Sequence, residues 1–143
     1  MYWHVRHILT FQDNENRTLQ ISDYANLKSW WVDRWGHAPS IQSLPQSGLI
    51  VSKDGVNLAA GWVYLDMTSP VAVIGWIVSN PENTALQSGK AIRYLIKGLL
   101  EITRSQGRLH VMTTASGSLT KTFQACGFDV KESGHDNLSL TLN

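Results

Sequence analysis

The segment that most constrains the fold is residues 88 to 104, where apolar side chains recur at helical spacing. One face carries the apolar residues Ile92, Leu95, Ile96, Leu99 and Ile102, and another carries the charged residues Lys90, Arg93, Lys97, Glu101 and Arg104. The apolar run VAVIGWIV precedes this helix, and LHVMTT follows it after Gly107. The three segments predict a strand, helix, strand crossover, and such connections are right-handed.

Strands are also expected before the crossover. Residues 2 to 9 are rich in aromatic and β-branched types and predict a first strand. A helix capped by Ser22 is expected next, ending at Gly36. From Gly48 onward, two strand-like runs around an Asp-Gly turn lead into VAVIGWIV, which predicts a three-stranded antiparallel meander.

The end of the chain has the pattern of a short helix and two strands. The helix is expected from about Ser118 to Gly127, with Leu119, Phe123 and Cys126 on its apolar side. The runs FDVKE and LSLTL, separated by a SGHDN turn, predict a C-terminal hairpin.

Composition and length limit the functions to consider. The chain has 143 residues and a net charge of +1, so a single domain over residues 1 to 143 is expected, without a broad field attracting nucleic acid. Nucleic acid is therefore not the expected partner, although binding to it is kept as an alternative. No apolar run approaches the roughly 18 to 20 residues of a membrane span, so no membrane partner is expected. The lone Cys126 makes an internal disulfide impossible and suits a cytoplasmic location. The histidines lack metal-ligand spacing, so no metal site is expected.

Residues 84 to 91 open the central helix and offer a place for an anion. A helix start leaves backbone N–H groups unpaired and carries the positive end of the helix dipole. Gly89 lets a ligand approach the backbone, Ala91 keeps the next turn small, and Lys90 and Arg93 add positive charge. An ordinary helix start with Ser88 as the cap explains the same residues.

The order of these elements resembles the GNAT superfamily of coenzyme A-dependent N-acyltransferases over nearly the whole chain. In that family the central helix begins with Q/R-x-x-G-x-G/A. LQSGKA, from Leu86 to Ala91, matches the final Gly-x-Ala but has leucine where glutamine or arginine is expected. SGSLTKTFQACGFDV is similar to the short family helix that ends in a Gly-Phe pair. LAAGWVYL and WIVSNP also resemble small acetyltransferase-like proteins of tailed phages.

The resemblance implies an α/β (α+β) fold with a mixed, mostly antiparallel sheet flanked by helices. It implies acetyl-CoA as cofactor and transfer of an acetyl group to an amine by direct attack. The strand at Ile77 to Ser79 is implied to pair with the pantetheine arm through its backbone. The full set of implied cofactor-binding residues is Ile77, Val78, Ser79, Gln87, Ser88, Gly89, Lys90, Ala91, Arg93, Ser116 and Phe123.

The usual acid and base of the family have no obvious counterparts. Gly75 precedes Trp76 on the strand where some members have a glutamate base, and Phe123 stands where a tyrosine often protonates the departing thiolate. Tyr64, Ser79 and Thr114 are therefore the candidate catalytic residues, by donating or relaying a proton. Tyr64 has a second interpretation as a half-buried strand aromatic.

Substrate contacts are expected near the end of the first helix. Asp33 and His37 stand where the resemblance places the substrate-facing loop, and a solvated helix end explains them equally well. Trp30 can stack on a flat substrate such as a base, whereas Trp31 and Trp35 are expected in the core. Trp62 is a further candidate substrate-binding residue.

Three functions remain open from the sequence. The leading hypothesis is an N-acetyltransferase for an unknown small-molecule, peptide or nucleotide amine, compatible with a homodimer and, if phage-encoded, with the host cytoplasm. A GNAT-like binding or inhibitory module that has lost catalysis is the main alternative, because Leu86, Gly75 and Phe123 depart from useful family positions. A phage acyltransferase that modifies nucleotides or DNA is the third.

Overall fold

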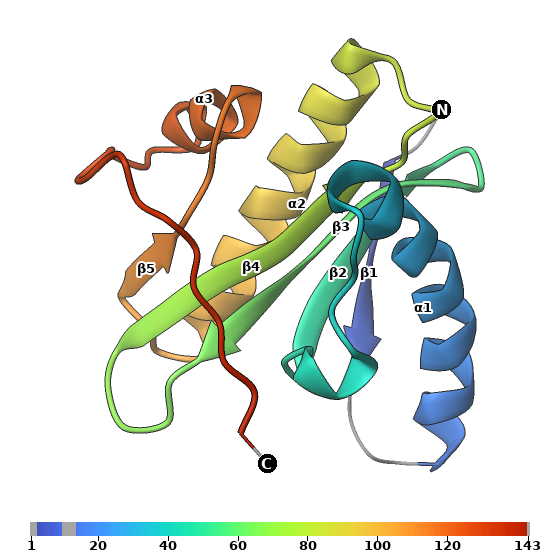
Figure 1. Cartoon of the computed structure of the whole chain (residues 1–143), viewed down its shortest axis with the longest axis horizontal. Helices are drawn as coiled ribbons and strands as arrows, with labels where there is room; N and C mark the ends of the chain where they lie inside the picture. Colours follow the sequence, from blue (N-terminus) through green and yellow to red (C-terminus); the bar gives the residue numbers. More distant parts are fainter. Residues whose placement is uncertain (1–2, 10–13, 143) are drawn as a thin grey trace.

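The computed structural model describes the backbone of residues 3–9 and 14–142, and the side chains of residues 3–6 and 23–142. Five strands, three α-helices and one short 3-10 helix follow one another along these residues (Figure 1). They are β1 (Trp3–Leu9), α1 (Asn14–Trp35), η1 (Ile41–Ser43), β2 (Ser47–Lys53), β3 (Val56–Leu65), β4 (Val71–Ser79), α2 (Ala85–Ser105), β5 (His110–Thr113) and α3 (Ser118–Ala125).

The strands form one sheet in the order β1-β2-β3-β4-β5. The pairs from β1 to β4 are antiparallel, and β4 pairs with β5 in parallel across the α2 crossover. The hairpin between β2 and β3 turns at Asp54 and Gly55, whose φ angles of 51° and 80° are those that a two-residue turn requires. The mixed, mostly antiparallel sheet, the meander and the crossover are therefore confirmed.

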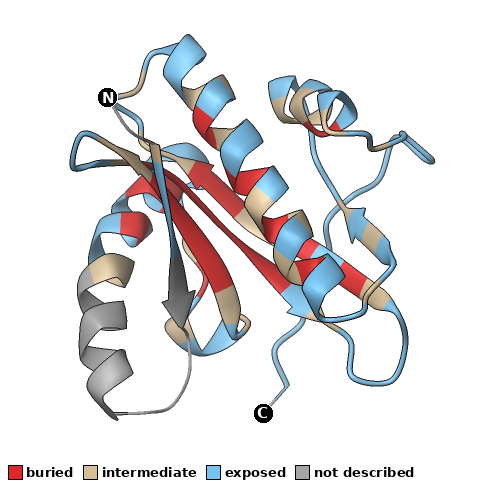
Figure 2. Cartoon of the chain, turned by 180° about the vertical axis from the view of Figure 1, so that it is seen from behind, coloured by how far each residue is buried: buried red, intermediate tan, exposed pale blue. Residues whose placement is uncertain are grey.

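Helices cover both faces of the sheet. α2 and α3 lie on one face, seen in front in Figure 2, and α1 lies on the other. The α2 face carries a buried cluster that includes Leu49, Leu95, Leu99 and Phe123. The α1 face carries a second cluster that includes Trp31 and is rich in tryptophan. No helix in the described part of the chain is long and apolar enough to cross a membrane.

The first helix ends before Gly36 as predicted, but its start and the burial of Trp35 differ from the prediction. α1 begins at Asn14, so Ser22 lies inside the helix and does not cap it. Trp31 is in the core as expected, at 0% exposure, but Trp35 is 43% exposed, so its expected burial was wrong. Helical spacing had placed Trp35 on the apolar face, yet burial also needs a neighbouring element to cover the side chain. Trp35 is the last residue of α1.

The predicted C-terminal hairpin was wrong. Residues 128–142 contain no strand, and this segment runs from α3 to the C-terminus at the opposite end of the molecule (Figure 1). Leu138, Leu140 and Leu142 alternate as in a strand, but they are 91%, 83% and 84% exposed. Alternating apolar residues form a strand only where the edge of another strand can pair with them and an apolar layer can cover them. In the described part of the chain these leucines have neither.

Candidate active site

The candidate site lies where β4 and β5 separate. Their parallel pairing runs from Val71 opposite His110 to Ile74 opposite Thr113. At this last pair the Thr113 hydroxyl donates to the Ile74 carbonyl over 2.9 Å. β4 then continues to Ser79 beside β3 alone, while β5 ends and the chain turns toward α3 (Figure 1). Backbone groups on the β5 side of this stretch have no strand partner among the described residues, so an extended ligand can pair with them.

A β-bulge in β4 begins at the same place. Trp62 of β3 pairs with Gly75 and Ala60 pairs with Val78, so Trp76 and Ile77 together oppose the single residue Gly61. Trp76 has a φ of +59°, which is unusual for a bulky side chain. A bulge bends its strand and increases the local twist. The separation of β4 from β5 therefore starts one residue after their last pair.

The side chains of Ile77 and Val78, which follow Trp76, belong to the core. Ile77 is 7% exposed and packs in the α2-side cluster, and Val78 is 3% exposed in the α1-side cluster. Ser79 is partly exposed at the end of β4. For Ile77 and Val78 only the backbone is left to contact a ligand, and the predicted backbone pairing with a cofactor stays a prediction.

Two asparagines fix the loop between β4 and α2. Asn80 donates its side-chain amide to the Asn57 carbonyl over 3.0 Å, and Asn83 donates to the Leu58 carbonyl over 2.9 Å. Both acceptors lie at the beginning of β3. The loop is therefore tied to the sheet, and the start of α2 is held at a fixed position beyond the bulge.

The first turn of α2 is closed by its own capping box. Thr84 is the N-cap: its hydroxyl accepts from the Gln87 N–H over 3.2 Å, and the Gln87 side chain accepts from the Thr84 N–H over 2.9 Å. Ser88, which was expected to be the cap, instead accepts from the Asn83 amide over 3.2 Å. The expectation for Ser88 was wrong because the cap lies four residues earlier, at Thr84. Gln87 and its N–H are thus occupied within the protein.

The first turns of α2 combine open space and positive charge. A Cβ added at Gly89 would meet nothing within 4 Å, so this position has room beside the helix. Lys90 and Arg93 are exposed, whereas Ala91 is fully buried against the sheet. Burial raises the pKa of the Cys126 thiol at the end of α3, and the charges of Lys97 and Arg93 oppose this rise. Lys97 and Arg93 therefore act electrostatically on the end of α3.

The two candidate residues around α3 have different environments. Ser116 is exposed in the loop after β5. Phe123 is 3% exposed and makes an edge contact with Phe128, with ring centroids 4.9 Å apart. Phe123 is thus a core residue without a surface for a ligand, and its ring offers no proton.

Tyr64 is the candidate catalytic residue with the most developed hydrogen bonding. Its hydroxyl donates to the Ser43 carbonyl over 2.9 Å and accepts from the Trp76 indole over 2.9 Å. Thr114 is exposed directly after the last residue of β5, near this point of the sheet. Tyr64 pairs with Val73, so Ser79 lies further along β4 by roughly 15 to 20 Å. Tyr64 and Ser79 therefore do not form one cluster.

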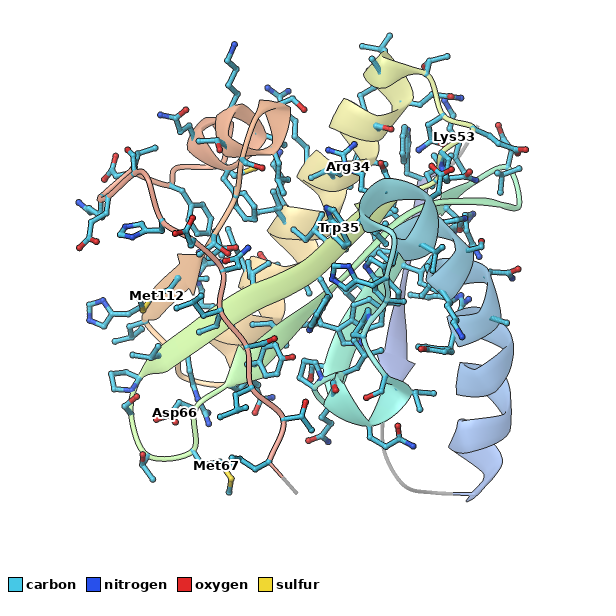
Figure 3. The ribbon with its side chains drawn as sticks, viewed as in Figure 1. Arg34, Trp35, Lys53, Asp66, Met67 and Met112 are labelled. Atoms are coloured by element: carbon cyan, nitrogen blue, oxygen red, sulfur yellow. The ribbon has the colours of Figure 1, made fainter. Side chains whose placement is uncertain are left out.

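The four candidate substrate-binding residues divide into two pairs. Trp30 and Trp62 are 8% and 1% exposed, so both belong to the α1-side core and neither presents a stacking surface. Asp33 and His37 are exposed, and the His37 ring nitrogen Nδ1 lies 3.1 Å from the Trp35 carbonyl. The exposed indole at this end of α1 is Trp35, which projects beside Arg34 in Figure 3.

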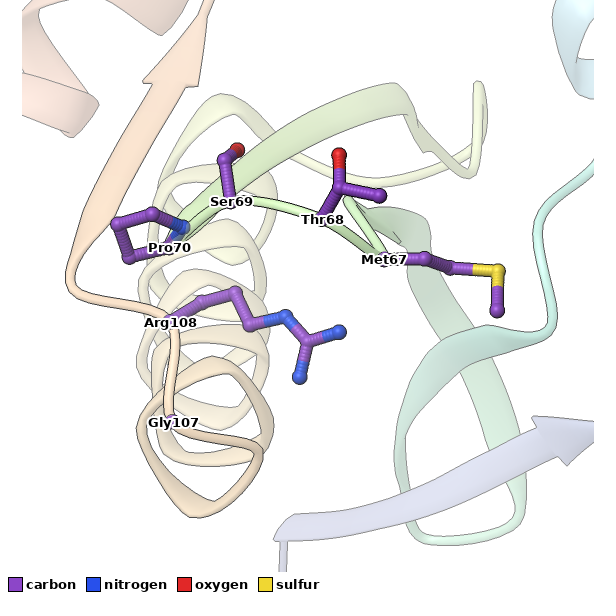
Figure 4. Close-up of a pocket in the computed structure, with 6 residues that line it drawn as sticks. All are labelled: Met67, Thr68, Ser69, Pro70, Gly107 and Arg108. Carbon is purple, nitrogen blue, oxygen red and sulfur yellow. The ribbon is translucent and has the colours of Figure 1, made fainter.

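A separate shallow hollow of about 310 Å³ lies at the other end of the sheet (Figure 4). It is lined by the β3–β4 turn from Met67 to Pro70 and by Gly107 and Arg108 after α2. The Arg108 guanidinium donates twice to the Asp66 carbonyl, over 3.0 and 2.7 Å, and also to the Gln106 carbonyl. This cation is engaged in holding the two loops together, and the hollow is remote from the strand separation.

Residues that the sequence analysis had not assigned shape the site as much as those that it had. Thr113 marks the last β4–β5 pair, Thr84 caps α2, and Trp76 forms the bulge with support from Trp31. The Thr-x-x-Gln spacing of the capping box was the one signal readable in the sequence. The bulge had no such signal, because the neighbouring Gly75 is the residue that a left-handed backbone would favour.

Comparison with known proteins places this architecture among acetyltransferases. No protein-family model matches the sequence. No match was found among curated proteins either. Solved structures do match: the chain has the GNAT acetyltransferase fold, which confirms the resemblance at the level of fold.

Three solved structures illustrate the match. An acetyltransferase from Trypanosoma brucei has a TM-score of 0.65 and 17% identity, covering 97% of this chain and 100% of that one. A soil-metagenome aminoglycoside acetyltransferase in complex with sisomicin has a TM-score of 0.65 and 12% identity, covering 99% and 97%. The aminoglycoside N-acetyltransferase AAC(6')-Iy in complex with CoA has a TM-score of 0.63 and 16% identity, covering 96% and 95%.

Proposed function

We propose that the protein is an N-acyltransferase that uses acetyl-CoA and transfers the acetyl group to an amine. The observation that carries this proposal is the separation of β4 from β5 after Ile74, which leaves the backbone from Gly75 to Ser79 with no neighbouring strand on its β5 side among the described residues. The start of α2 lies directly beyond this stretch. The same fold holds CoA in AAC(6')-Iy, according to the description of that structure. The acceptor amine belongs to a small molecule, a peptide or a nucleotide.

The residues present fit acetyl-CoA in part. Bound acetyl-CoA would supply a thioester as the acyl donor. The backbone of Ile77, Val78 and Ser79 would pair with the amides of its pantetheine arm, and the open position at Gly89 would leave room for the pyrophosphate. Lys90, Arg93, Ser88 and Ser116 are proposed to contact the phosphates and their surroundings. Gln87, Ala91 and Phe123 are occupied in the cap or the core and are proposed to act only through the shape of the site.

Proton handling is proposed to rest on hydroxyl groups. Tyr64 and Thr114 stand near the point where the strands separate, and Ser79 stands at the far end of β4. In the structure the Tyr64 proton is directed at the Ser43 carbonyl. To donate a proton to a leaving group, Tyr64 must exchange that partner, and the Trp76 indole would continue to hold its oxygen. Trp35, Asp33 and His37 are proposed to face the acceptor.

A second candidate function is binding of the same cofactor without turnover. Three observations favour it: Gly75 offers no side-chain base, Phe123 is buried and offers no acid, and the capping box of Thr84 and Gln87 occupies part of the helix start. Backbone pairing would persist in such a protein, because it does not depend on those side chains. A nucleotide- or DNA-modifying acyltransferase has less support, since Trp30 is buried.

The test is the thermal midpoint of the purified protein with and without acetyl-CoA, beside a desulfo-CoA arm. A ligand at about 100 times its Kd adds about 2.7 kcal/mol of stability, which raises the midpoint by roughly 9 °C for a domain of this size. Gly89→Glu should abolish the shift by filling the open position with a negative side chain, and Gly89→Ala should keep it. No shift with either ligand at millimolar concentration would refute the proposal.

Turnover separates the two functions. Free thiol release from acetyl-CoA should appear with members of an amine panel and be absent without amine. A midpoint shift with no thiol release for any aminoglycoside, polyamine, peptide or nucleotide amine would favour the binding module.

A further inference from the structure

The bulge residue Trp76 has a backbone conformation that its own side chain does not favour. Its φ of +59° lies in the left-handed region, where residues with a Cβ are strained and bulky ones are rare. Such a conformation persists only where the surrounding structure holds it, and it is often found where function requires it. Glycine would adopt it without strain, yet the glycine of this strand is at position 75.

Hydrogen bonds join Trp76 to two other elements, and a third element holds one of its partners. The Trp31 indole of α1 donates to the Trp76 carbonyl over 3.2 Å. The Trp76 indole donates to the Tyr64 hydroxyl of β3 over 2.9 Å, and Tyr64 donates in turn to the Ser43 carbonyl of η1 over 2.9 Å. The Trp31 and Trp76 rings also meet edge-on at 6.4 Å and 78°. The backbone and the side chain of Trp76 are thus each held by a separate partner.

The location of the bulge gives this network a consequence for the site. The last β4–β5 pair is Ile74 with Thr113, and the bulge begins after Gly75. The direction in which β4 leaves β5, and therefore the position of the free backbone at Ile77 to Ser79, is set by the conformation of Trp76. A change of φ at this residue would turn those N–H and C=O groups away from a ligand lying beside them.

We propose that Trp76, held by Tyr64 and Trp31, is a positioning residue that aims the free edge of β4 at the acyl carrier. The inference rests on the proposed function, since it takes the pantetheine arm of CoA as the ligand of that edge. None of the three side chains needs to touch the cofactor. Tyr64 then has a role in binding that is independent of any proton that it supplies.

The test is the Kd of desulfo-CoA, measured by calorimetry at a temperature where every variant is folded. This ligand lacks the thiol and undergoes no reaction, so the loss of a proton donor cannot change its affinity. Tyr64→Phe removes only the hydroxyl that holds the indole, and we expect the Kd to rise about three- to tenfold, the range for one lost hydrogen bond. Trp76→Gly should raise the Kd less than Trp76→Ala, because glycine adopts the left-handed backbone unaided and alanine does not.

Two comparisons separate positioning from general stability. In the Trp76→Gly background, Tyr64→Phe should cause no further rise in Kd, because the bond that it breaks is already absent. Leu27, which is 2% exposed, belongs with Trp31 to the buried cluster on the α1 face of the sheet. Leu27→Ala removes this side chain and should lower the thermal midpoint without changing the Kd of desulfo-CoA. Circular dichroism confirms that each variant is folded at the working temperature.

Each outcome decides the matter. If the wild type binds neither acetyl-CoA nor desulfo-CoA, the proposed function fails and this inference falls with it. If the wild type binds but Tyr64→Phe leaves the Kd unchanged, as Leu27→Ala does, only the positioning role is overturned. An equal rise in Kd from Tyr64→Phe in the wild-type and Trp76→Gly backgrounds would also overturn it.

Discussion

Replacing Gly48 by alanine tests whether the α1 side of the sheet is packed as rigidly as its geometry indicates. Gly48 of β2 pairs with Trp62 of β3. A Cβ at position 48 would lie 2.5 Å from Nε1 and 2.6 Å from Cδ1 of the Trp62 indole. Carbon atoms in contact are about 3.5 to 4.0 Å apart, so the ring or the strand must move by about 1 Å. Trp62 is 1% exposed and lies 5.4 Å from the Trp31 ring, centroid to centroid, so it has little space to move.

Two opposing terms determine the size of the effect. Alanine in place of glycine within a strand gains roughly 0.5 to 1 kcal/mol by reducing the freedom of the unfolded chain. Overpacking a rigid interior costs about 1 to 3 kcal/mol. The clash should win, leaving Gly48→Ala less stable by up to about 2.5 kcal/mol. For a domain of this length that lowers the thermal midpoint by as much as about 8 °C.

The assay is urea unfolding followed by tryptophan fluorescence, with the thermal midpoint as a second measurement. Gly98→Ala is the matched control, since its Cβ would also come within 3.0 Å of a neighbour, at 2.7 Å, but that neighbour is the terminal methyl carbon Cδ1 of Leu49. We expect Gly98→Ala to be far less destabilising. In a Trp62→Leu background, Gly48→Ala should no longer destabilise. If Gly48→Ala is as stable as the wild type, the reasoning from a fixed indole ring is refuted.

Three further predictions follow from local contacts. Thr84→Ala removes the capping box and should lower the free energy of unfolding by about 1 kcal/mol in urea unfolding, and an unchanged midpoint would contradict the cap assignment. Cys126 should react with iodoacetamide more slowly than a free cysteine at pH 8, because burial raises the pKa of its thiol; a faster rate would contradict this. Hydrogen bonds from Ser69 and Thr68 lower the pKa of the Asp66 carboxyl below its ordinary value of 3.8. The stabilising contribution of Asp66 is therefore present above pH 3.8 and is lost as the pH falls through the pKa that Asp66 has in the folded protein. NMR titration of Asp66 should give a midpoint below 3.8.

Local patterns predicted those parts of the fold in which sequence and packing agree. The helix expected over residues 88 to 104 is α2, Ala85–Ser105, because its apolar stripe lies on the sheet along its whole length. The Asp-Gly turn was predictable because its backbone angles admit few other residues. Gly107, with a φ of +73°, ends α2 for the same reason.

Other features depend on partners that a local pattern does not contain. The alternating leucines from Leu138 to Leu142 read as a strand, but a strand exists only beside another strand. The helical spacing of Trp31 and Trp35 gave their common face, but only Trp31 has neighbours that bury it. Trp30 was expected to stack on a substrate, but it is buried because the apolar side of α1 that packs on the sheet includes its position.

The site itself is composed largely of backbone, and this explains both what the sequence revealed and what it concealed. The free edge from Gly75 to Ser79 requires a bulge and a diverging strand, which no side-chain motif encodes. In the proposed arrangement it depends on Trp76 being held by Trp31 of α1 and by Tyr64 of β3, whose hydroxyl is bonded in turn to η1. The proposed cofactor binding through such an edge would not need Gln or Arg at position 86 or a polar group at position 123. Chemistry on the bound cofactor does not, because protons must be carried by side chains. The proposed binding and the proposed turnover would therefore be separable, and turnover is the more demanding test of the proposed activity.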